Sequence, residues 1–482
     1  MTGTPVADGW QRLSPRMLLV HPVHEVMRQL PVLIGSLVLG SATGNPVWTV
    51  AGVALIVTYG LARWFTTSYR IGPEEVTLRT GVLQRSVLSV PRNRIRSVST
   101  DARLLHRLLG LTVLRVSTGR EATGDTAFAL DAVPAGDVPR LRAVLLADSL
   151  PPQPSGRVLA AWQPSWLRYS PLTFTGLAMI AAALGVFSQS GLLRPLRDSA
   201  VLRAGEGAAE GLGVWGAVAV GAGVVLVASV ALSVAQSLLT YANLLLRRDG
   251  EVLHLSHGLL RVREHTYDMR RLRGGTLREP LLVRLFGGAR LDAVMTGVAG
   301  AGEASQLLPP CPRATAEAVL VDLIERPDVV TGALTPHGPA AIRRRWVRAL
   351  ALPVVASVGA GIAALTVGIG VWVWPVLVLL SAFSVFLAVD RSRSLGHRVD
   401  GGWLVARAGS MQRRRDCVAG PGIVGWTVRQ SWPQRRAGVA TLVAATAAGT
   451  KRYEVLDVPA EAAWTIAATT SPWLAATSWA RD

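Results

Sequence analysis

The chain carries two short stretches, Leu78-Arg79-Thr80-Gly81 and Arg107-Leu108-Leu109-Gly110, whose pattern recurs twice more and decides the fold. Their glycines lie 29 residues apart, and the same interval separates two later pairs, Gly258 and Gly287, then Gly409 and Gly438. An arginine stands three residues before the second glycine of every pair. A fixed interval of this kind is the signature of a repeated structural unit. Function is therefore to be sought in a module that is used three times.

The composition of the chain is that of a membrane protein. Half of its 482 residues are hydrophobic and 17% are charged, and its mean hydropathy is +0.36. Soluble domains usually contain about 25% charged residues. The formal charge of +19 suits the anionic cytoplasmic leaflet, where each basic group is worth about 1 kcal/mol. Nucleic acid, another polyanion, is not expected as a partner, because the basic residues concentrate beside the apolar stretches.

Pairs of apolar stretches precede the repeats and predict six transmembrane helices in three hairpins. A helix needs about 20 apolar residues to cross a bilayer, and the predicted hairpins cover residues 30–64, 172–236 and 349–390. Arginines flank the hairpins, whereas the turns of the first and third carry no charge. The positive-inside rule then places the N-terminus, the soluble modules and the C-terminus in the cytoplasm. A charged loop from about Arg194 to Glu210 is expected inside the second hairpin.

The remaining segments are expected to be soluble modules and short connections. The divisions are an N-terminal segment (1–29), three modules (65–150, 237–326 and 391–482) and two linkers (151–171 and 327–348). Each module shows about half a dozen short alternating segments and then an amphipathic helix. Such a unit is a small β-sandwich or partly open barrel capped by a helix. The expected fold class is therefore an α+β membrane protein, with a third module that is degenerate in sequence.

Several motifs of the first repeat resemble those of a known family. They are Tyr69-Arg70-Ile71, Leu78-Arg79-Thr80-Gly81-Val82-Leu83, Val90-Pro91-Arg92-Asn93-Arg94-Ile95-Arg96-Ser97-Val98 and, before the first hairpin, Leu19-Val20-His21-Pro22. Together they resemble bacterial pleckstrin-homology (PH)-like membrane proteins, which carry the second type of bacterial PH domain. The resemblance covers essentially the whole chain as three copies. It implies a PH-like fold and residence in the bacterial cell membrane, and it suggests a shorter PH-like membrane protein as a partner.

Arginines that alternate along a predicted strand are the candidate binding residues of the first module. They are Arg92, Arg94 and Arg96, and the second module carries a parallel run at Arg270, Arg271 and Arg273. Residues two apart on a strand face the same side, so such a row suits acidic lipid headgroups or an acidic partner. A solvated face in an arginine-rich chain is the plainer interpretation, and it ranks first.

The sequence shows no motif of a catalytic, cofactor or metal site. It contains no phosphate-binding glycine loop, dinucleotide fingerprint, nucleophile elbow or H-E-x-x-H motif. His254 and His257 have the spacing of a ligand pair, but residues three apart on a strand face opposite sides. Cys311 and Cys417 fall in different repeats and imply no disulfide framework. The chain is therefore expected to work without catalysis, metal or cofactor.

Two functions remain open at this point. The first is a membrane-embedded scaffold or binding protein whose cytoplasmic modules dock a partner membrane protein or membrane lipids, as a homo- or hetero-oligomer. The alternative is a component of a membrane system for export or for resistance to a toxic compound. Few charged groups lie within the apolar stretches, whereas coupled transport usually depends on such groups. The scaffold is the favoured hypothesis.

Overall fold

The computed structural model describes most of the chain. The described residues are 10–12, 14, 47, 50, 54, 58, 62, 65–72, 74–81, 85–91, 97–102, 104–117, 128–145, 156–190, 200–296 and 305–476. They fall into two compact units: residues 1–162 with 239–271, and residues 163–238 with 272–482. Almost all of the first predicted hairpin lies outside the described residues, and so do Arg92, Arg94 and Arg96.

Each repeat has six strands, a short helix after the fourth strand and a longer helix at the end. Module 1 contains β2 (Ser68–Ile71), β3 (Glu75–Thr80), β4 (Ser86–Pro91), β5 (Ser97–Ala102), α4 (Leu104–Leu108), β6 (Leu111–Ser117), β7 (Phe128–Pro134) and α5 (Val138–Leu145). Module 2 contains β9 (Leu245–Asp249), β10 (Val252–His257), β11 (Val262–Asp268), β12 (Leu272–Pro280), α9 (Leu281–Leu285), β13 (Gly288–Met295), β14 (Gln306–Pro312) and α10 (Arg313–Ile324). Module 3 contains β15 (Gly396–Asp400), β16 (Trp403–Ala408), β17 (Gln412–Ala419), β18 (Ile423–Arg429), α14 (Trp432–Arg436), β19 (Val439–Thr446), β20 (Arg452–Pro459) and α15 (Ala462–Thr470).

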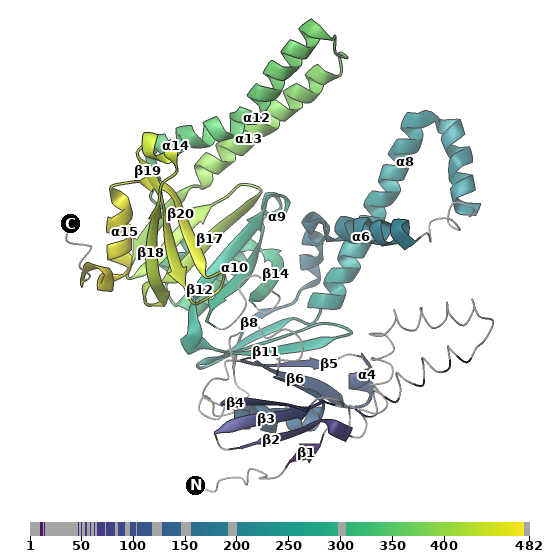
Figure 1. Ribbon diagram of the computed structural model, residues 1–482, viewed down its shortest axis with the longest axis vertical. Helices are drawn as coiled ribbons and strands as arrows, with labels where there is room; N and C mark the ends of the chain where they lie inside the picture. Colours follow the sequence, from purple (N-terminus) through teal and green to yellow (C-terminus); the bar gives the residue numbers. More distant parts are fainter. Residues whose placement is uncertain are drawn as a thin grey trace. The chain divides into compact units, whose positions relative to one another are not determined.

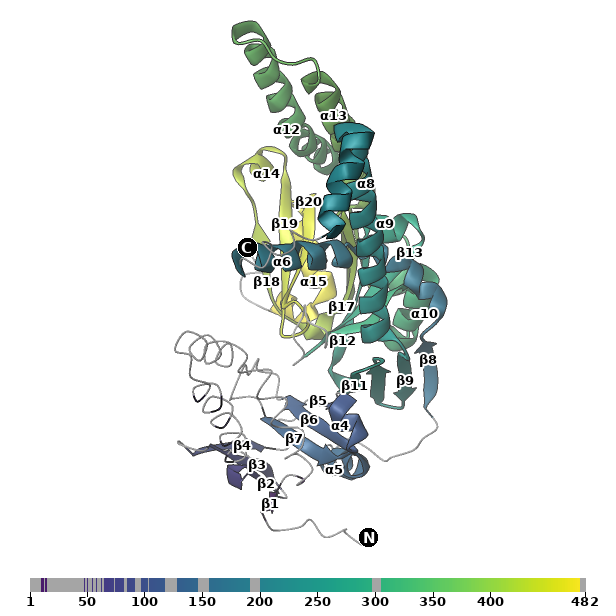
Figure 2. The ribbon, with the colours of Figure 1, turned by 90° about the vertical axis from the view of Figure 1, so that its right-hand side faces the viewer.

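The third module keeps the whole element order despite its divergent sequence. Its core is built from alternating positions on the strands, among them Leu404, Ala406, Leu442 and Ala444, and α15 adds Ile466 to the same cluster. The helix α15 lies against the sheet of β18, β19 and β20 (Figure 2). Alternation of buried and exposed side chains specifies a strand and its inward face. The sequence motifs of the first module are not kept in the third module, but the alternation of buried and exposed side chains along its strands is.

The second glycines of the repeat, Gly110, Gly287 and Gly438, end the short helices α4, α9 and α14. Their φ angles are 67°, 72° and 65°, the left-handed conformation that glycine adopts without a Cβ clash. In each module the amide of this glycine donates to the carbonyl of the arginine three residues earlier, at 3.1, 2.9 and 3.2 Å. These short helices were missing from the sequence-based expectation. The recurrent arginine and glycine are the last turn of a helix and its cap.

The first glycines, Gly81, Gly258 and Gly409, form the turn between the second and third strands. Their φ angles are 125°, 113° and 102°, and a Cβ at Gly258 would lie 2.0 Å from the carbonyl oxygen of Arg261. No side chain fits at that distance, so this turn requires glycine. The 29-residue interval is thus the distance from one glycine-dependent turn to one glycine-dependent helix cap.

Two of the sheets continue from one module into the next. In the first unit a seven-stranded sheet has the order β7-β6-β5-β11-β10-β9-β8, and in the second a six-stranded sheet has the order β14-β13-β12-β17-β16-β15. The remaining sheets are β1-β2-β3-β4, with β1 at Gln11–Arg12, and β18-β19-β20. The modules are therefore joined edge to edge, which the sequence did not predict.

Segments before the three predicted hairpin regions pair with the first strand that follows each region. β1 pairs with β2, and β8 (Arg157–Ala161), in a segment expected to be a linker, pairs with β9. Before the third hairpin the same place holds a single bridge between Thr335 and His397. The chain thus enters and leaves each hairpin region side by side.

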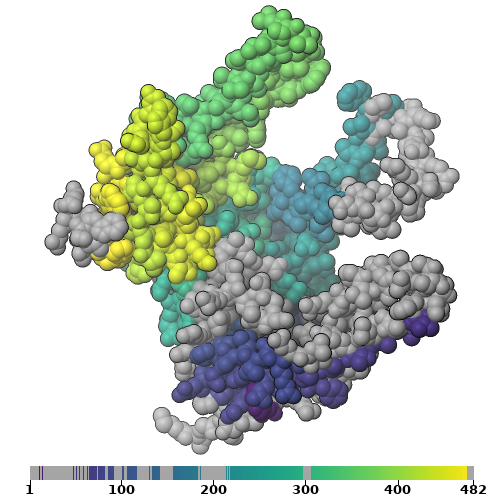
Figure 3. All heavy atoms as spheres, in the orientation of Figure 1, coloured from purple at the N-terminus to yellow at the C-terminus, as the bar shows by residue number. Residues whose placement is uncertain are grey.

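Three described helices are long and apolar enough to cross a membrane: Val218–Tyr241, Gly338–Thr366 and Val373–Ser394. The first is part of α8 (Ala200–Tyr241), and the others are α12 and α13, which form an antiparallel hairpin at module 3 (Figure 1). In Figure 3 the green atoms of this hairpin project away from the yellow atoms of module 3. Between 6% and 17% of their most apolar windows is buried inside the protein. Such extensive exposed apolar surface indicates a membrane protein.

The second predicted hairpin differs from its expectation. Its first span, expected from residue 172, is a 3₁₀ turn followed by α6 (Thr175–Ser190), whose 16 residues are fewer than the about 20 that a helix needs to cross a bilayer. The expected charged loop is helical from Ala200, and α8 breaks only at Gly213, where φ is 67°. Alanines are frequent in this stretch, and alanine is the strongest helix former. The described residues therefore support three spans and not six.

Candidate functional site

The junction between modules 2 and 3 is a ladder of seven residue pairs between β12 and β17 (Figure 1). At its centre the Thr276 hydroxyl donates to the buried Asp416 carboxylate at 2.8 Å, and burial raises the pKa of Asp416. Val294 of β13 joins the hydrophobic core of module 3. The two modules share backbone hydrogen bonds, a buried polar contact and apolar core, so this junction is a structural interface.

The junction between modules 1 and 2 is a ladder of six pairs between β5 and β11. Arg261 makes an ion pair with Asp101 across it, and the Thr100 hydroxyl donates to Glu264 at 3.3 Å. At this junction polar contacts take the place of the apolar contact that Val294 makes at the junction between modules 2 and 3. The strands used are nevertheless the same ones: the fourth strand of one module and the third strand of the next.

Both junctions have the same register. In the first junction Tyr267, nine positions after the first glycine of module 2, pairs with Ser97, thirteen positions before the second glycine of module 1. In the second junction Val418 and Gly274 stand at the same two positions of modules 3 and 2, and they pair in the same way. A shift of one residue would turn every side chain to the opposite face. Since the register is kept while most contacts differ, the junction is a repeated interface.

The recurrent arginine before the second glycine also reaches across each junction. Arg107 donates to the carbonyl of Leu259 at 3.0 Å, and Arg284 donates to the carbonyl of Ser410 at 3.4 Å. Leu259 and Ser410 each follow the first glycine of the next module. Arg284 also pairs with Asp390 of α13 at 2.8 Å. The sequence landmarks thus mark the places where consecutive modules meet.

The arginines singled out in module 2 occupy different elements. Arg270 and Arg271 lie in the 3₁₀ turn η6 (Met269–Arg271). Both make ion pairs with the carboxylate of Asp268, with Nε to oxygen distances of 3.1 Å for Arg270 and 3.5 Å for Arg271. Arg273 lies on β12, in the other unit, with its side chain beside Gly422. The row of three on one strand face is therefore absent from this module, and Asp268 offsets part of the positive charge at η6.

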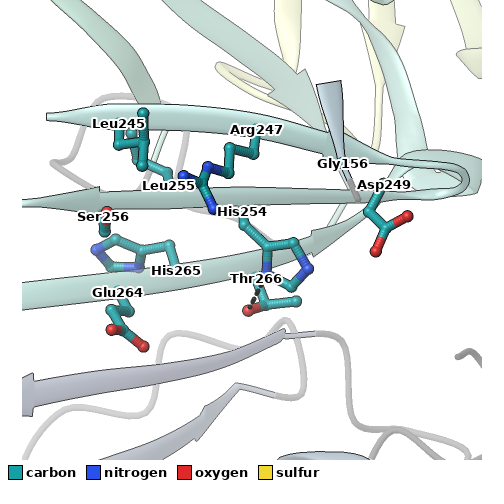
Figure 4. Close-up of a pocket in the computed structure, with 10 residues that line it drawn as sticks. All are labelled: Gly156, Leu245, Arg247, Asp249, His254, Leu255, Ser256, Glu264, His265 and Thr266. Atoms are coloured by element: carbon teal, nitrogen blue, oxygen red, sulfur yellow. Dashed lines mark hydrogen bonds between the residues drawn. The ribbon is translucent and has the colours of Figure 1, made fainter. Parts of the chain in front are cut away.

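A polar cavity of about 260 Å³ lies on one face of β9, β10 and β11 (Figure 4). Strand pairing places His254 between Arg247 and Thr266, and Ser256 next to Glu264. The Thr266 hydroxyl lies 3.3 Å from His254 Nδ1. The lining of the cavity combines Arg247 with the carboxylates of Asp249 and Glu264. The cavity therefore suits a polar ligand that carries both charges better than a simple anion. Of its lining residues only His254 had been singled out in the sequence, because the lining comes from three strands and no local motif joins it.

The two histidines of the possible ligand pair do lie three positions apart on one strand, β10. His257 is buried, its Nδ1 lies 2.7 Å from the Thr240 carbonyl, and its ring is stacked on His265. Burial, and then the neighbouring His257, lowers the pKa of His265 to about 4. Within the described part of the chain, no three histidine, cysteine or acidic side chains gather as metal ligands would.

Comparison with known proteins places the repeat in a family. Residues 27–149 and 347–470, together just over half of the chain, match the bacterial PH domain. No curated protein and no solved structure matches. The two matched stretches include modules 1 and 3, while module 2, between them, has the same order of strands and helices. The chain belongs to the bacterial PH domain family.

Proposed function

We propose that this chain is a non-enzymatic scaffold of the bacterial cell membrane, crossing the bilayer six times in three hairpins. The paired segments at the ends of the hairpin regions carry the proposal. β8 hydrogen-bonds to β9, and Thr335 to His397, so each intervening helical region starts and ends at the same place. A hairpin of two spans meets that requirement. All modules and both termini would then share the cytoplasmic side, where anionic lipids are concentrated.

The modules would dock to anionic lipid headgroups through arginines close to the membrane. Arg343 and Arg348 near the start of α12, and Arg393 near the end of α13, are exposed. Arginines at span ends reach the headgroup region readily because their aliphatic stems cover apolar surface. These three are better placed for lipid than the run at Arg270, where Asp268 is a competing anion.

Lipid retention by the purified full chain tests this assignment. The triple substitution of Arg343, Arg348 and Arg393 by Gln should lower the phosphatidylglycerol that copurifies per chain in mild detergent by several-fold. Arg452→Gln, at an exposed arginine on β20, is the matched control and should retain wild-type amounts. Equal retention by the triple variant and the control would remove lipid docking from the proposal.

Docking of a partner membrane protein is the second part of the scaffold function. The edge-to-edge junctions show that these modules already recognise one another by strand pairing, a mode that also captures separate chains. Extraction in gentle detergent should therefore recover the chain in a stoichiometric complex. Recovery of single chains only, at every extraction condition, would contradict a scaffold.

A further inference from the structure

One strand on each side of the repeated junction has no neighbouring module among the described residues. β4, the counterpart of β11 and β17, ends the order β1-β2-β3-β4, and β18, the counterpart of β5 and β12, starts the order β18-β19-β20. An edge strand presents a row of backbone donors and acceptors to any chain that can pair with it. The protein thus has both kinds of strand that form its internal junctions, and each of these two strands lies at the edge of its sheet among the described residues.

Side chains on these edges are exposed where their counterparts at the internal junctions are covered. Val87 on β4 is 59% exposed, whereas Arg415, at the same position of β17, is 8% exposed. On β18, Val424 is 67% exposed. Apolar side chains in such exposed positions on an edge strand mark a surface for association.

A glycine of the internal junction recurs on the open edge. A Cβ at Gly274 would lie 1.8 Å from the carbonyl oxygen of Cys417 on the adjacent module, so β12 needs glycine there. Gly425 occupies the same position on β18, where a Cβ would meet nothing closer than Ala445 at 3.9 Å. Glycine weakens a strand unless another backbone approaches closely. Nothing in the described part of this chain makes that approach to Gly425.

The junction arginine recurs as well. Arg107 and Arg284 each donate to a carbonyl of the following module, and Arg435 is their counterpart in module 3. Arg435 is exposed. The open side of module 3 therefore carries the strand, the glycine and the arginine that the β12 side of an internal junction uses.

We propose that β18 of one copy of this chain pairs antiparallel with β4 of a second copy, repeating the internal junction head to tail. The internal register, applied to these strands, pairs Gly425 with Val90, Trp426 with Ser89 and Arg429 with Ser86. Because the two surfaces of this contact differ, the assembly extends as a row or closes into a ring. This self-assembly goes beyond the scaffold function and does not depend on lipid binding.

Disulfide crosslinking of full-length chains in detergent tests the register. Two differently tagged chains are co-expressed, one carrying Ser86→Cys and the other Arg429→Cys; a second combination uses Ser89→Cys with Trp426→Cys. Opposed residues of an antiparallel pair have Cβ atoms about 4.5–5.5 Å apart, and closest in the pairs without hydrogen bonds. The two combinations sample both pair types, since Ser86 and Ser89 are three residues apart. The native Cys311 and Cys417 are buried.

At least one combination should give a covalent dimer that contains both tags, and Gly425→Val or Arg435→Ala should reduce its yield at least fivefold. Ser86→Cys with Val424→Cys, about 17 Å out of register at ~3.4 Å per residue, should give none. Arg436→Ala, next to the junction arginine, is the matched control and should leave the yield unchanged. Unchanged tryptophan fluorescence of the Gly425→Val chain verifies that it folds, as the free space there predicts.

Three results would overturn the proposal. They are crosslinking that ignores register, the absence of a dimer with both tags in either combination, and a dimer yield that Gly425→Val leaves intact. A chain carrying both Ser86→Cys and Arg429→Cys adds a further readout. It should form a ladder of multimers or a closed oligomer, whereas a disulfide within single chains, or one joining the cysteine introduced on β18 to a different protein, would also refute pairing with a second copy.

Discussion

At the scale of single residues, a pair of histidines fixes the start of the third hairpin to module 3. His337 precedes α12 and is 4% exposed. Its Nδ1–H donates to the Leu456 carbonyl at 2.7 Å, so its Nε2 must accept from His397 Nδ1, 2.9 Å away. That arrangement needs a neutral His337 ring, because only an unprotonated Nε2 can accept a hydrogen bond. Burial, and then the neighbouring His397, lowers the pKa of His337 to about 4.

The stability of this part of the protein should therefore fall in mild acid. A histidine whose folded-state pKa lies below its unfolded value of about 6.5 binds its proton mainly in the unfolded state. Stability is then lost as the pH falls from about 6.5 towards 4. Lowering the pH from 7 to 5 should cost roughly 2 kcal/mol through His337. Thermal unfolding in detergent, followed by tryptophan fluorescence, measures the loss.

His337→Asn keeps an N–H donor for Leu456 but cannot be protonated, so it should weaken this pH dependence. If His337→Asn and the wild type lost the same stability between pH 7 and pH 5, the histidine pair would not be the cause.

At the scale of secondary-structure elements, glycine substitutions distinguish β12, which pairs with β17, from β18, which lies at the edge of its sheet. Gly274→Ala places a Cβ 1.8 Å from the Cys417 carbonyl oxygen and must separate β12 from β17. It should destabilise the chain by about 2 kcal/mol or more, as overpacking does. Gly425→Ala, at the matching position of β18, should change the stability of the single chain by less than about 1 kcal/mol. Limited proteolysis of each variant at rising temperature compares the two, and equal losses would mean that the junction is not tightly packed at Gly274.

A buried carboxylate connects the helical hairpin to the module that follows it. Asp457 on β20 is 1% exposed; it pairs with Arg344 and with Arg345, the latter at 2.7 Å, and accepts from Gln434 at 2.9 Å. Removing one partner of a buried ion pair costs about 3–5 kcal/mol because the other charge stays buried. Asp457→Ala should thus destabilise the attachment of α12 by about that amount, and Asp457→Asn, which keeps hydrogen-bonding capacity, by less.

Unfolding of the third module in detergent measures both variants. Asp400→Ala removes a carboxylate that is 36% exposed and pairs with Arg398, and it should cost less than about 1 kcal/mol. If the Asp457→Ala and Asp400→Ala chains unfolded alike, the buried carboxylate would not anchor the hairpin.

The same elements show what could and could not be predicted from the sequence. The glycine interval predicted three repeats of one module, the third degenerate in sequence, because turns and caps constrain residue type locally. Arg344 and Arg345 were interpreted only as arginines beside a span, since nothing nearby in the sequence identifies Asp457 as their partner. The junction ladders were also missed, because the pairing of β12 with β17 joins residues about 140 positions apart. Local patterns therefore predicted the module, whereas contacts between modules needed the structure.

At the scale of the whole molecule, the proposed topology places the tip of each hairpin on the opposite side of the membrane from the modules. The connection between α12 and α13 contains Val371, which is 81% exposed. Val371→Cys in intact cells should therefore react with a maleimide that cannot cross the cytoplasmic membrane. The positive-inside rule gives the direction, since arginines lie at the module ends of this hairpin and none lies at its tip.

Arg452→Cys, at an exposed position on β20, should react with the same reagent only after the cells are permeabilised. The wild-type chain is the background control, because burial raises the pKa of its two cysteine thiols to about 12 and keeps both protonated and thus unreactive. Labelling of Arg452→Cys in intact cells, with Val371→Cys protected, would mean that the modules face outward. Anionic cytoplasmic lipids would then be out of their reach, and the arginines at the span ends would need another role.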